Sequence, residues 1–464
     1  MVFPTVEFAI FFPIVLVLSW ALMSRQHVWK PFMIAASYTF YSAANPLFCF
    51  LLAGITLGNH GASKLIHGSD DERFRRWVVG AAVALNLATL GVFKYYGFFA
   101  EEVNGVLDKV GLGVPVPLAA IALPIGISFI VFQAISYTVD VKRRVIEPAS
   151  PIDVAVYLSF FSHLVAGPIV RAREFLPQLA APRDPRKVAL GAAVFLIIVG
   201  LIKKVAIADT LARELVDPVM AVPQDFSAPD VVLAAYGFVV QIFCDFSGYT
   251  DIAIGTALLL GFVFPQNFRS PLGATSFREF WQRWHITLTR FLRDFLYIPL
   301  GGSRGGKLLT ARNIMITMVL GGLWHGAGWG FVLYGTILGA ALVIEQYFRG
   351  LGWRLPKWLG WFIVFHVVAL VGVFFRAPNL DIATTVLGRL AHPGPTTLWT
   401  LPVVAMVVGI VAMQCVPQRP LDALRVRIEQ LHPVALGASM ATAIVLVAAT
   451  VSSQGVPPFI YFQF

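Results

Sequence analysis

One histidine lies in an apolar segment where neither a lipid-facing helix nor simple helix packing would need an imidazole. The segment GGLWHGAGWG (321–330) places Trp324 and His325 among five glycines, between two apolar stretches. Ionisable side chains at membrane depth are costly and usually face a cavity or a partner, and a neutral imidazole can act as a general base. Two interpretations of His325 follow: a base on a cavity, or a packing histidine with one hydrogen bond. The glycines fit both, because small residues admit either a slender ligand or a close neighbouring helix.

A base in an apolar tunnel suits acyl transfer in particular. Such a reaction makes a hydroxyl nucleophilic and has to exclude the water that would hydrolyse a thioester donor. A proton relay in a transporter is the alternative, although most of the apolar stretches lack the paired intramembrane carboxylates that a relay would use.

The exception is the segment QIFCDFSGYTD (241–251), which contains two carboxylates. Asp245 and Asp251 either order a cavity network or cap a membrane interface. Lys203 and Lys204 lie in another apolar stretch and either reach the inner interface or meet donor phosphates. The residues that we expect to line or support a tunnel are Gln241, Asp245, Ser247, Tyr249, Trp284 and Trp324.

A second histidine lies within the segment FREFWQRWHITLTRFLRDFLYIPLGGSRGG (277–306). Its large apolar residues recur at steps of three and four, which predicts a helix with one apolar face. Such a helix lies in the membrane interface or enters a bundle obliquely. Glu279 precedes Arg283 by four residues, so the two side chains can lie side by side. His285 is off the apolar face, where it either lines a cavity or bonds a headgroup or backbone carbonyl.

The same segment ends in the basic, glycine-rich loop GGSRGG (301–306). This loop could hold an anionic phosphate or a carrier protein, and a simple membrane-facing turn explains it equally well. The basic residues that we expect on the donor side are Arg283, Arg304 and Lys307.

The composition indicates a polytopic membrane protein. Of 464 residues, 58% are hydrophobic and 13% are charged, against about 25% charged in soluble domains. The net charge of +10 is expected to come from cytoplasmic loops that face anionic lipid, so we expect no nucleic-acid partner. The three cysteines lie far apart, which predicts neither a disulfide framework nor a metal site.

Apolar stretches long enough to cross a bilayer recur along the chain. The expected spanning segments are 6–23, 77–99, 118–139, 189–209, 230–246, 313–346 (as one or two helices), 358–375, 398–415 and 436–453. Less regular apolar segments are 32–57, 153–170 and 250–266. Proline and glycine interrupt many of them, and broken helices at membrane depth survive only around shielded or wet interiors. We therefore expect an all-α bundle with an internal cavity.

Lysine and arginine set the expected orientation, because cytoplasmic loops are enriched in them. The first stretch lacks a basic preceding region and a cleavage site, so it is expected to be a spanning helix rather than a signal peptide. Arg25 and Lys30 follow it, whereas Met1–Glu7 contains no basic side chain. Arg419, Arg425 and Arg427 precede the last span. Both termini are therefore expected outside.

Six segments together resemble the membrane-bound O-acyltransferase superfamily, and within it the bacterial alginate O-acetyltransferase branch. They are LPIGISFIVFQAISYTVDVKR (123–143), HLVAGPIVR (163–171), GLIKKVAIAD (200–209), FCDFSGYTDIAIG (243–255), NFRSPLGATSFREFWQRWHITLTRFLRDFLYIPLGG (267–302) and LWHGAGWGFVLYG (323–335). The resemblance implies one domain over 1–464 with about 11–13 transmembrane and re-entrant helices around a central tunnel. N-terminal helices (1–115), a catalytic core (116–346) and C-terminal helices with an outer tail (347–464) would compose it.

The resemblance also implies a function in the bacterial inner membrane. The superfamily's signature histidine corresponds to His325, and its second polar position corresponds to His285. An acetyl group would pass from acetyl-CoA, or from an acyl-carrier thioester, toward an exported polysaccharide such as alginate. The implied partners are an extracytoplasmic acetyltransferase of the SGNH-hydrolase type and the polysaccharide-export machinery. No bound cofactor and no metal are implied.

The ending FIYFQF (459–464) resembles the aromatic tail of this branch. There a tyrosine hydroxyl is proposed to receive the acyl group, and here that residue would be Tyr461. An interfacial aromatic anchor is the alternative. Rival acceptors to alginate are peptidoglycan, cellulose and teichoic acid, the last through D-alanylation, and a non-catalytic acyl or proton transporter is a rival of another class.

Overall fold

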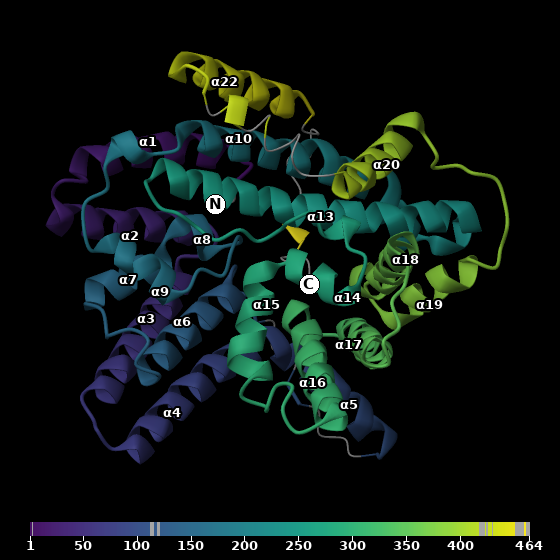
Figure 1. The fold of residues 1–464 in the computed structure, drawn as a ribbon, viewed down its shortest axis with the longest axis horizontal. Coiled ribbons are helices and arrows are strands. Elements are labelled where there is room, and N and C mark those ends of the chain that lie inside the picture. The colour runs from purple at the N-terminus through teal and green to yellow at the C-terminus, as the bar shows by residue number, and fades with distance from the viewer. Residues whose placement is uncertain are drawn as a thin grey trace. The chain divides into compact units, whose positions relative to one another are not determined.

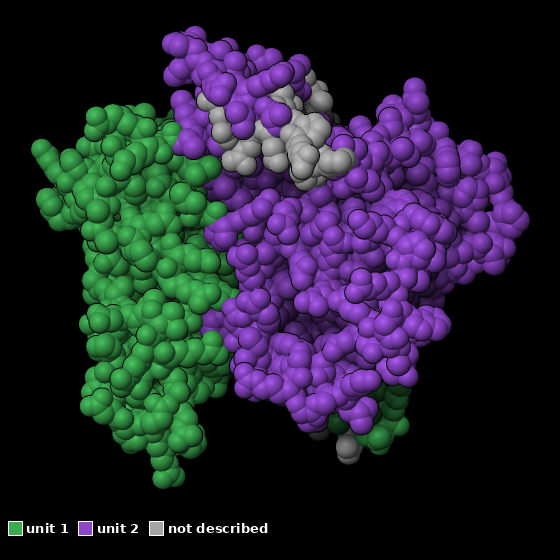
Figure 2. All heavy atoms as spheres, in the orientation of Figure 1, with its two compact units in different colours: residues 1–188, 257–264 green, residues 189–256, 265–464 purple. Residues whose placement is uncertain are grey.

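The computed structural model describes residues 1, 3–111, 116–117, 121–416, 423, 426–428, 430–450 and 459–460, with only the backbone for 447–450. Every regular element in these ranges is helical, which confirms the all-α prediction. Backbone contacts divide the chain into two compact units, coloured separately in Figure 2: unit 1 is Met1–Val188 with Ala257–Phe264, and unit 2 is Ala189–Thr256 with Pro265–Phe464. The division of one domain into 1–115, 116–346 and 347–464 stays a prediction.

Unit 1 is built from the helices coloured purple to blue in Figure 1. They are α1 (Val6–Leu22), α2 (Gln26–Ser42), α3 (Leu47–His67), α4 (Glu72–Leu90), the π-helix η1 (Gly91–Tyr95), α5 (Tyr96–Lys109), α6 (Ile127–Lys142), α7 (Pro151–Ser159), α8 (Phe161–Leu164), α9 (Ala172–Phe175), and the 3-10 turns η2 (Leu176–Leu179) and η3 (Pro185–Lys187). α6 is almost entirely buried and packs against α3 and α4. Polar side chains join these helices: Asn59 Oδ1 accepts from Asn86 Nδ2 at 3.0 Å and from Thr138 Oγ1 at 2.9 Å.

The third expected span begins later than its hydropathy predicts. The stretch 118–139 predicts one helix, but residues 121–126 are not helical and α6 begins at Ile127. Pro124 and Gly126 explain the difference, because a proline lacks the amide hydrogen of a helix interior and Gly126 has a left-handed φ of 74°.

Unit 2 contains the remaining helices, coloured teal to yellow in Figure 1. They are α10 (Leu190–Leu201), η4 (Ile202–Ala208), α11 (Asp209–Leu211), η5 (Ala212–Val216), α12 (Asp217–Ala221), η6 (Pro223–Asp225), α13 (Ala228–Leu259, whose last turn belongs to unit 1), η7 (Pro271–Gly273), α14 (Phe277–Arg283), α15 (Ile286–Leu292), η8 (Arg293–Tyr297), α16 (Lys307–His325), α17 (Trp329–Gly350), α18 (Lys357–Arg376), α19 (Leu380–Arg389), α20 (Leu401–Cys415) and α22 (Pro433–Thr450).

Three expected stretches matter for the site: one is confirmed, and the other two are changed. The stretch 313–346 is indeed two helices, α16 and α17, which are joined by Gly326–Gly328 and lie side by side (Figure 1). The segments 230–246 and 250–266 were expected to be separate, but one helix, α13, contains most of both. No proline interrupts it after its first turn, so its polar residues lie in a helix interior.

Five helical stretches are long and apolar enough to cross a membrane among the described residues. They are Glu72–Lys109, Leu190–Ala221, Ala228–Leu259, Trp329–Gly350 and Lys357–Arg376. Shorter apolar helices add Val6–Leu22, Leu401–Cys415 and Pro433–Leu446. The polytopic all-α membrane architecture is thereby confirmed.

Candidate active site

His325 is the last residue of α16, at the point where the chain turns toward α17. The glycines around it permit close packing of these two helices: a Cβ on Gly322 would lie 2.3 Å from the Phe331 carbonyl oxygen, and one on Gly335 would lie 2.3 Å from the Met318 carbonyl oxygen. No larger residue fits either position without moving a backbone. Gly322 and Gly335 therefore serve helix packing close to His325, and room for a ligand at the other glycines stays a prediction.

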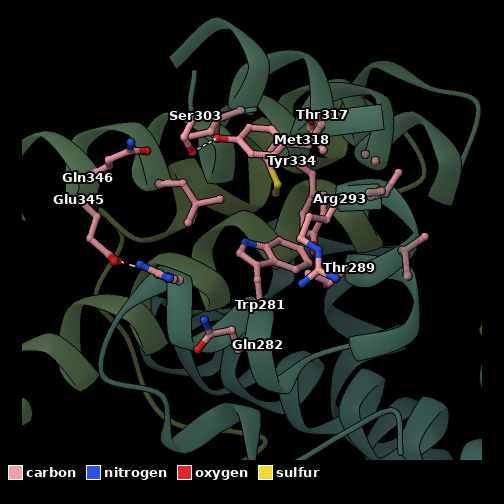
Figure 3. A pocket seen from close by; sticks show the side chains of 18 of the residues that line it. Trp281, Gln282, Thr289, Arg293, Ser303, Thr317, Met318, Tyr334, Glu345 and Gln346 are labelled. Atoms are coloured by element: carbon pink, nitrogen blue, oxygen red, sulfur yellow. Dashed lines mark hydrogen bonds between the residues drawn. The ribbon is translucent and has the colours of Figure 1, made fainter. Parts of the chain in front are cut away.

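His325 is one of the residues that line a cavity of about 510 Å³ in unit 2. Figure 3 shows side chains from α14, α15, η8, α16 and α17 around this cavity. Its lining residues are Arg278, Trp281, Gln282, Leu288, Thr289, Leu292, Arg293, Tyr297, Ser303, Ile314, Thr317, Met318, Gly321, Gly322, His325, Tyr334, Leu342, Glu345, Gln346 and Arg349. His325 itself is only 2% exposed, and its ring contacts Tyr334 and Phe375 with centroid distances of 5.8 and 5.2 Å.

His285 lies in a helix break that the sequence pattern did not predict. The expected continuous helix from Phe277 ends at Arg283, and a new helix begins at Ile286, with His285 between them at a left-handed φ of 41°. The segment around Asn267 bridges the break: Arg269 N–H donates to Arg283 O, and Ile286 N–H donates to Asn267 O, both at 2.9 Å. These bonds satisfy backbone groups that a helix end leaves open.

Asn267 also fixes the His285 imidazole. Its Oδ1 atom accepts hydrogen bonds from Thr287 N–H at 3.2 Å and from Thr287 Oγ1 at 2.9 Å, and it lies 3.2 Å from His285 Nδ1. Since a backbone N–H can only donate, the bonded side-chain atom is the amide oxygen, and His285 Nδ1 therefore carries the proton. His285 Nε2 is left as the basic nitrogen. Sequence reasoning missed Asn267, although the segment NFRSPLG that contains it was part of the resemblance.

One indole contacts both imidazoles. The Trp324 ring lies 5.8 Å from the His285 ring and 5.1 Å from the His325 ring, measured between centroids, and both pairs are edge-on. His285 is fully buried and also contacts Phe246 of α13 at 4.6 Å. The two predicted catalytic histidines are thus brought into one aromatic cluster, although 40 residues of sequence separate them.

Three arginines lie on the cavity wall, but they are not the three that the sequence pattern suggested. The wall includes Arg278, Arg293 and Arg349, the last paired with Glu345. Arg283 instead bonds Glu279 at 2.5 Å, as its spacing predicts, and the Ser270 carbonyl oxygen at 3.2 Å.

The other two expected donor contacts lie outside the cavity. Arg304 and Lys307 are exposed, and Lys307 lies over the Tyr347 ring. Neither is among the described lining residues. A role of Arg283, Arg304 and Lys307 as donor contacts stays a prediction.

The polar stretch of α13 is paired with the two lysines of η4. Lys204 Nζ lies 2.7 Å from Asp209 Oδ1 and 2.6 Å from Asp245 Oδ1, and Lys203 Nζ lies 2.7 Å from Asp251 Oδ2. Each lysine is therefore in an ion pair, and a role at the inner interface or at donor phosphates stays a prediction. Spacing within either segment alone could not predict the pairing.

Close packing of α10 on α13 produces these ion pairs. A Cβ on Gly200 would lie 2.6 Å from the Gly248 carbonyl oxygen, and one on Gly248 would lie 2.7 Å from the Gly200 carbonyl oxygen. The helices therefore approach to backbone contact one turn before Lys203 and Lys204.

The other expected supporting residues are buried, but the described cavity wall does not include them. Gln241, Ser247, Tyr249, Trp284 and Trp324 are all buried, and neither they nor Asp245 are among the described lining residues. Trp284 stacks on Phe280 at 5.6 Å and contacts Phe268 at 5.2 Å. Their supporting roles stay predictions.

Two residues of the C-terminal segment are described, and both are buried in unit 2. The Phe459 ring contacts Phe246 at 5.4 Å and Tyr249 at 4.5 Å, and Ile460 N–H donates to Asp245 Oδ2 at 2.9 Å. Tyr461, the expected acyl acceptor, lies outside the described residues.

Comparison with known proteins identifies relatives of this chain. The model of the MBOAT, membrane-bound O-acyltransferase, family matches residues 33–353. A probable alginate O-acetylase of Azotobacter vinelandii is 40% identical over 372 residues, which cover 79% of this chain and 73% of the relative. Another from Pseudomonas aeruginosa is 41% identical over 361 residues, covering 76% and 67%. A peptidoglycan O-acetyltransferase of Helicobacter pylori is 35% identical over 392 residues, covering 77% and 73%.

The family match covers more than half of the chain and includes both histidines, the cavity and most of unit 1. The membrane-spanning helices and the identity to named O-acetyltransferases agree with it. The chain belongs to the membrane-bound O-acyltransferase family, as a multi-pass membrane enzyme that transfers an acyl group from a donor substrate.

Proposed function

We propose that this enzyme moves an acetyl group from a cytoplasmic thioester, acetyl-CoA or an acetylated carrier protein, toward an exported polysaccharide of the alginate kind. His325 acts as the general base, and His285 assists it. The observation that supports this best is that His325 lines a cavity of about 510 Å³. Arg278, Arg293 and Arg349 on the same wall suit the phosphates of such a donor.

The chemical step needs only groups that the cavity can bring together. His325 takes the proton of the acceptor hydroxyl while the hydroxyl oxygen attacks the thioester carbonyl carbon. The new C–O bond forms, the C–S bond breaks, and the imidazolium returns its proton to the leaving thiolate. The apolar surroundings exclude the water that would otherwise hydrolyse the thioester.

The acceptor hydroxyl in this proposal is that of Tyr461. Support comes from its two described neighbours in sequence: Phe459 contacts Phe246, whose ring also contacts His285. The tail is thus anchored one aromatic ring away from the histidine cluster. An anchor without chemistry is the alternative role of the tail.

The acetyl group then leaves on the outer face of the inner membrane. An extracytoplasmic acetyltransferase of the SGNH-hydrolase type would accept it and pass it to the polysaccharide during export. The two named alginate O-acetylases favour alginate as the polymer, whereas the Helicobacter pylori relative makes peptidoglycan the second candidate.

The decisive experiment compares two histidines of unit 2. His325→Ala should lower acetyl transfer from labelled acetyl-CoA by about 10²- to 10⁴-fold, the range of general-base catalysis. His366→Ala is the matched control, because His366 lies in the spanning helix α18 and is not among the described cavity-lining residues. Both proteins should reach the membrane in wild-type amounts.

Two outcomes would contradict the proposal. Wild-type transfer by the His325→Ala enzyme would exclude this histidine as the base. Uptake of label into vesicles without any covalent acetyl product would favour a transporter over an enzyme of this mechanism.

A further inference from the structure

A buried cluster on η4, α11 and α13 has more hydrogen-bond acceptors than its single cation can satisfy. Lys204 is 1% exposed and lies between Asp209 and Asp245, at 2.7 and 2.6 Å. Two carboxylates thus share one ammonium group. Buried carboxylates need further hydrogen-bond donors, because an unsatisfied charge in a low-dielectric interior is costly.

The missing donor comes from the C-terminal segment. Asp245 uses Oδ1 for Lys204 and accepts the Ile460 backbone N–H on Oδ2 at 2.9 Å, across 215 residues of sequence. Hydrogen bonds to an ionised acceptor are about twice as strong as neutral ones. The contact is buried, since Ile460 is 2% exposed.

The side chain of Phe459, the residue before Ile460, packs against the same helix, α13. Phe459 is fully buried, and its ring lies against Tyr249 at 4.5 Å and Phe246 at 5.4 Å. Phe246 and Tyr249 are three residues apart on α13, so they share one helix face with each other. The segment is therefore recognised through one aromatic ring and one backbone amide.

We propose that Lys204, Asp245, Phe246 and Tyr249 form a docking site for the chain's own C-terminal segment, with Asp245 as a positioning residue. The inference rests on the proposed function in one respect, namely that the acceptor hydroxyl belongs to Tyr461, the next residue in the sequence. Asp245 accepts the Ile460 N–H, and Phe246 contacts the His285 ring at 4.6 Å. Docking thereby fixes the chain one residue before the acceptor hydroxyl.

Hydrogen–deuterium exchange of the peptide that contains Ile460 tests the docking without reference to catalysis. Asp245→Asn removes the negative charge and leaves Lys204 its bond to Asp209, so the buried cation keeps a partner. We expect the peptide to exchange at least about tenfold faster in this variant, as loss of a charge-assisted bond implies.

The neighbouring ion pair supplies a matched control. Asp251→Asn breaks the Lys203 pair between the same two helices, whereas the Ile460 N–H donates to Asp245. Its tail peptide should exchange as in the wild type. Equal exchange in the wild type and Asp245→Asn, or equal acceleration in both variants, would overturn the proposal.

A tail-side variant avoids any disturbance of the buried pair. Phe459→Ala removes the ring from Phe246 and Tyr249, and it should accelerate exchange of the Ile460 peptide in the same way. Unchanged exchange in this variant would also overturn the docking.

A second pair of variants measures whether docking positions the acceptor. Ile460→Pro removes the amide hydrogen, whereas Ile460→Val keeps it. We expect kcat for acetyl transfer to fall at least about tenfold in Ile460→Pro with an unchanged KM for the donor, because Asp245 is not among the described cavity-lining residues. Ile460→Val should stay within about twofold of the wild type, and equal kcat values would contradict a positioning role.

Tyr461→Phe separates failure of the docking from failure of the relay. Suppose that the Tyr461→Phe enzyme is fully active, that its Ile460 peptide is protected from exchange, and that adding Asp245→Asn removes this protection. This result would refute the relay and support the docking. A tail that exchanges freely in the wild type would refute the docking whatever the activity of Tyr461→Phe.

Discussion

The two histidines differ in how the backbone holds them. His325 ends a regular helix, whereas His285 adopts a left-handed φ of 41° in a gap between two short helices. A non-glycine residue in that region costs free energy and persists only where its surroundings hold it. Here hydrogen bonds to Asn267 stabilise this conformation, and they also select the tautomer in which His285 Nε2 is basic.

This arrangement predicts that Asn267 controls the rate rather than donor binding. Asn267→Leu keeps the size of the side chain but removes the acceptor of His285 Nδ1 and of Thr287. We expect kcat for acetyl transfer to fall by about 10- to 100-fold, the usual range for a residue that orients a functional histidine, with little change in the donor KM. Asn267→Asp, which retains the acceptor oxygen, should recover most of the rate. Wild-type kcat in Asn267→Leu would show that the tautomer does not matter.

The sequence could predict some of these residues and not others. His325 stands out because an ionisable residue among glycines in an apolar stretch has few structural explanations. Asn267 does not stand out, because its role depends on bonds to residues 18 and 20 positions away. The ion pair of Lys204 with Asp245 is likewise a product of tertiary packing, since it joins two helices.

At the scale of elements, close contact between helix backbones explains most of the site. The pairs Gly322–Gly335 and Gly200–Gly248 bring α16 to α17 close to His325, and α10 to α13 close to Lys204. Between helices in lipid, such packing replaces the hydrophobic effect as the source of association.

Gly335→Ala should therefore weaken the α16–α17 pair. Its Cβ would lie 2.3 Å from the Met318 carbonyl oxygen, which the backbone relieves only by moving. Overpacking of this kind costs about 1–3 kcal/mol, so the thermal midpoint in detergent should fall by several degrees and acetyl transfer should fall with it. Gly350→Ala is the control on the same helix, because nothing lies within 4 Å of its Cβ position. A Gly335→Ala enzyme as stable as this control would exclude a packing role for the glycine.

Hydropathy predicted the helices well and their interruptions poorly. The stretch 313–346 divides into α16 and α17, one of the two expected alternatives, at Gly326 and Gly328, because glycine weakens a helix interior. The break at His285 was missed, because the aromatic stripe from Phe277 continues across it at helical spacing. Its cause is a separate segment at Asn267–Arg269 that forms hydrogen bonds with both helix ends. The spacing of residues within 277–306 cannot predict these bonds.

At the scale of the whole molecule, charge predicts the direction of transfer. The 35 lysine and arginine residues exceed the 25 acidic residues, and in membrane proteins such an excess lies mainly in cytoplasmic loops. The loop 301–306 connects η8 to α16, and its Ser303 lines the cavity together with Arg293. If this basic loop faces the cytoplasm, the cavity that contains His325 takes its donor from that side.

Sealed vesicles of known orientation test this prediction, because acetyl-CoA is too polar to cross a bilayer unaided. External labelled acetyl-CoA should support acetylation with inverted inner-membrane vesicles, whereas right-side-out vesicles should need permeabilisation. An Arg304→Cys variant in a Cys49→Ser, Cys415→Ser background verifies the orientation of the loop, since Arg304 is exposed and the remaining Cys244 is buried. A membrane-impermeant maleimide should label it only in inverted vesicles. Equal acetylation by both kinds of intact vesicle would place the donor entrance on the outer face, and the proposed direction of transfer would be wrong.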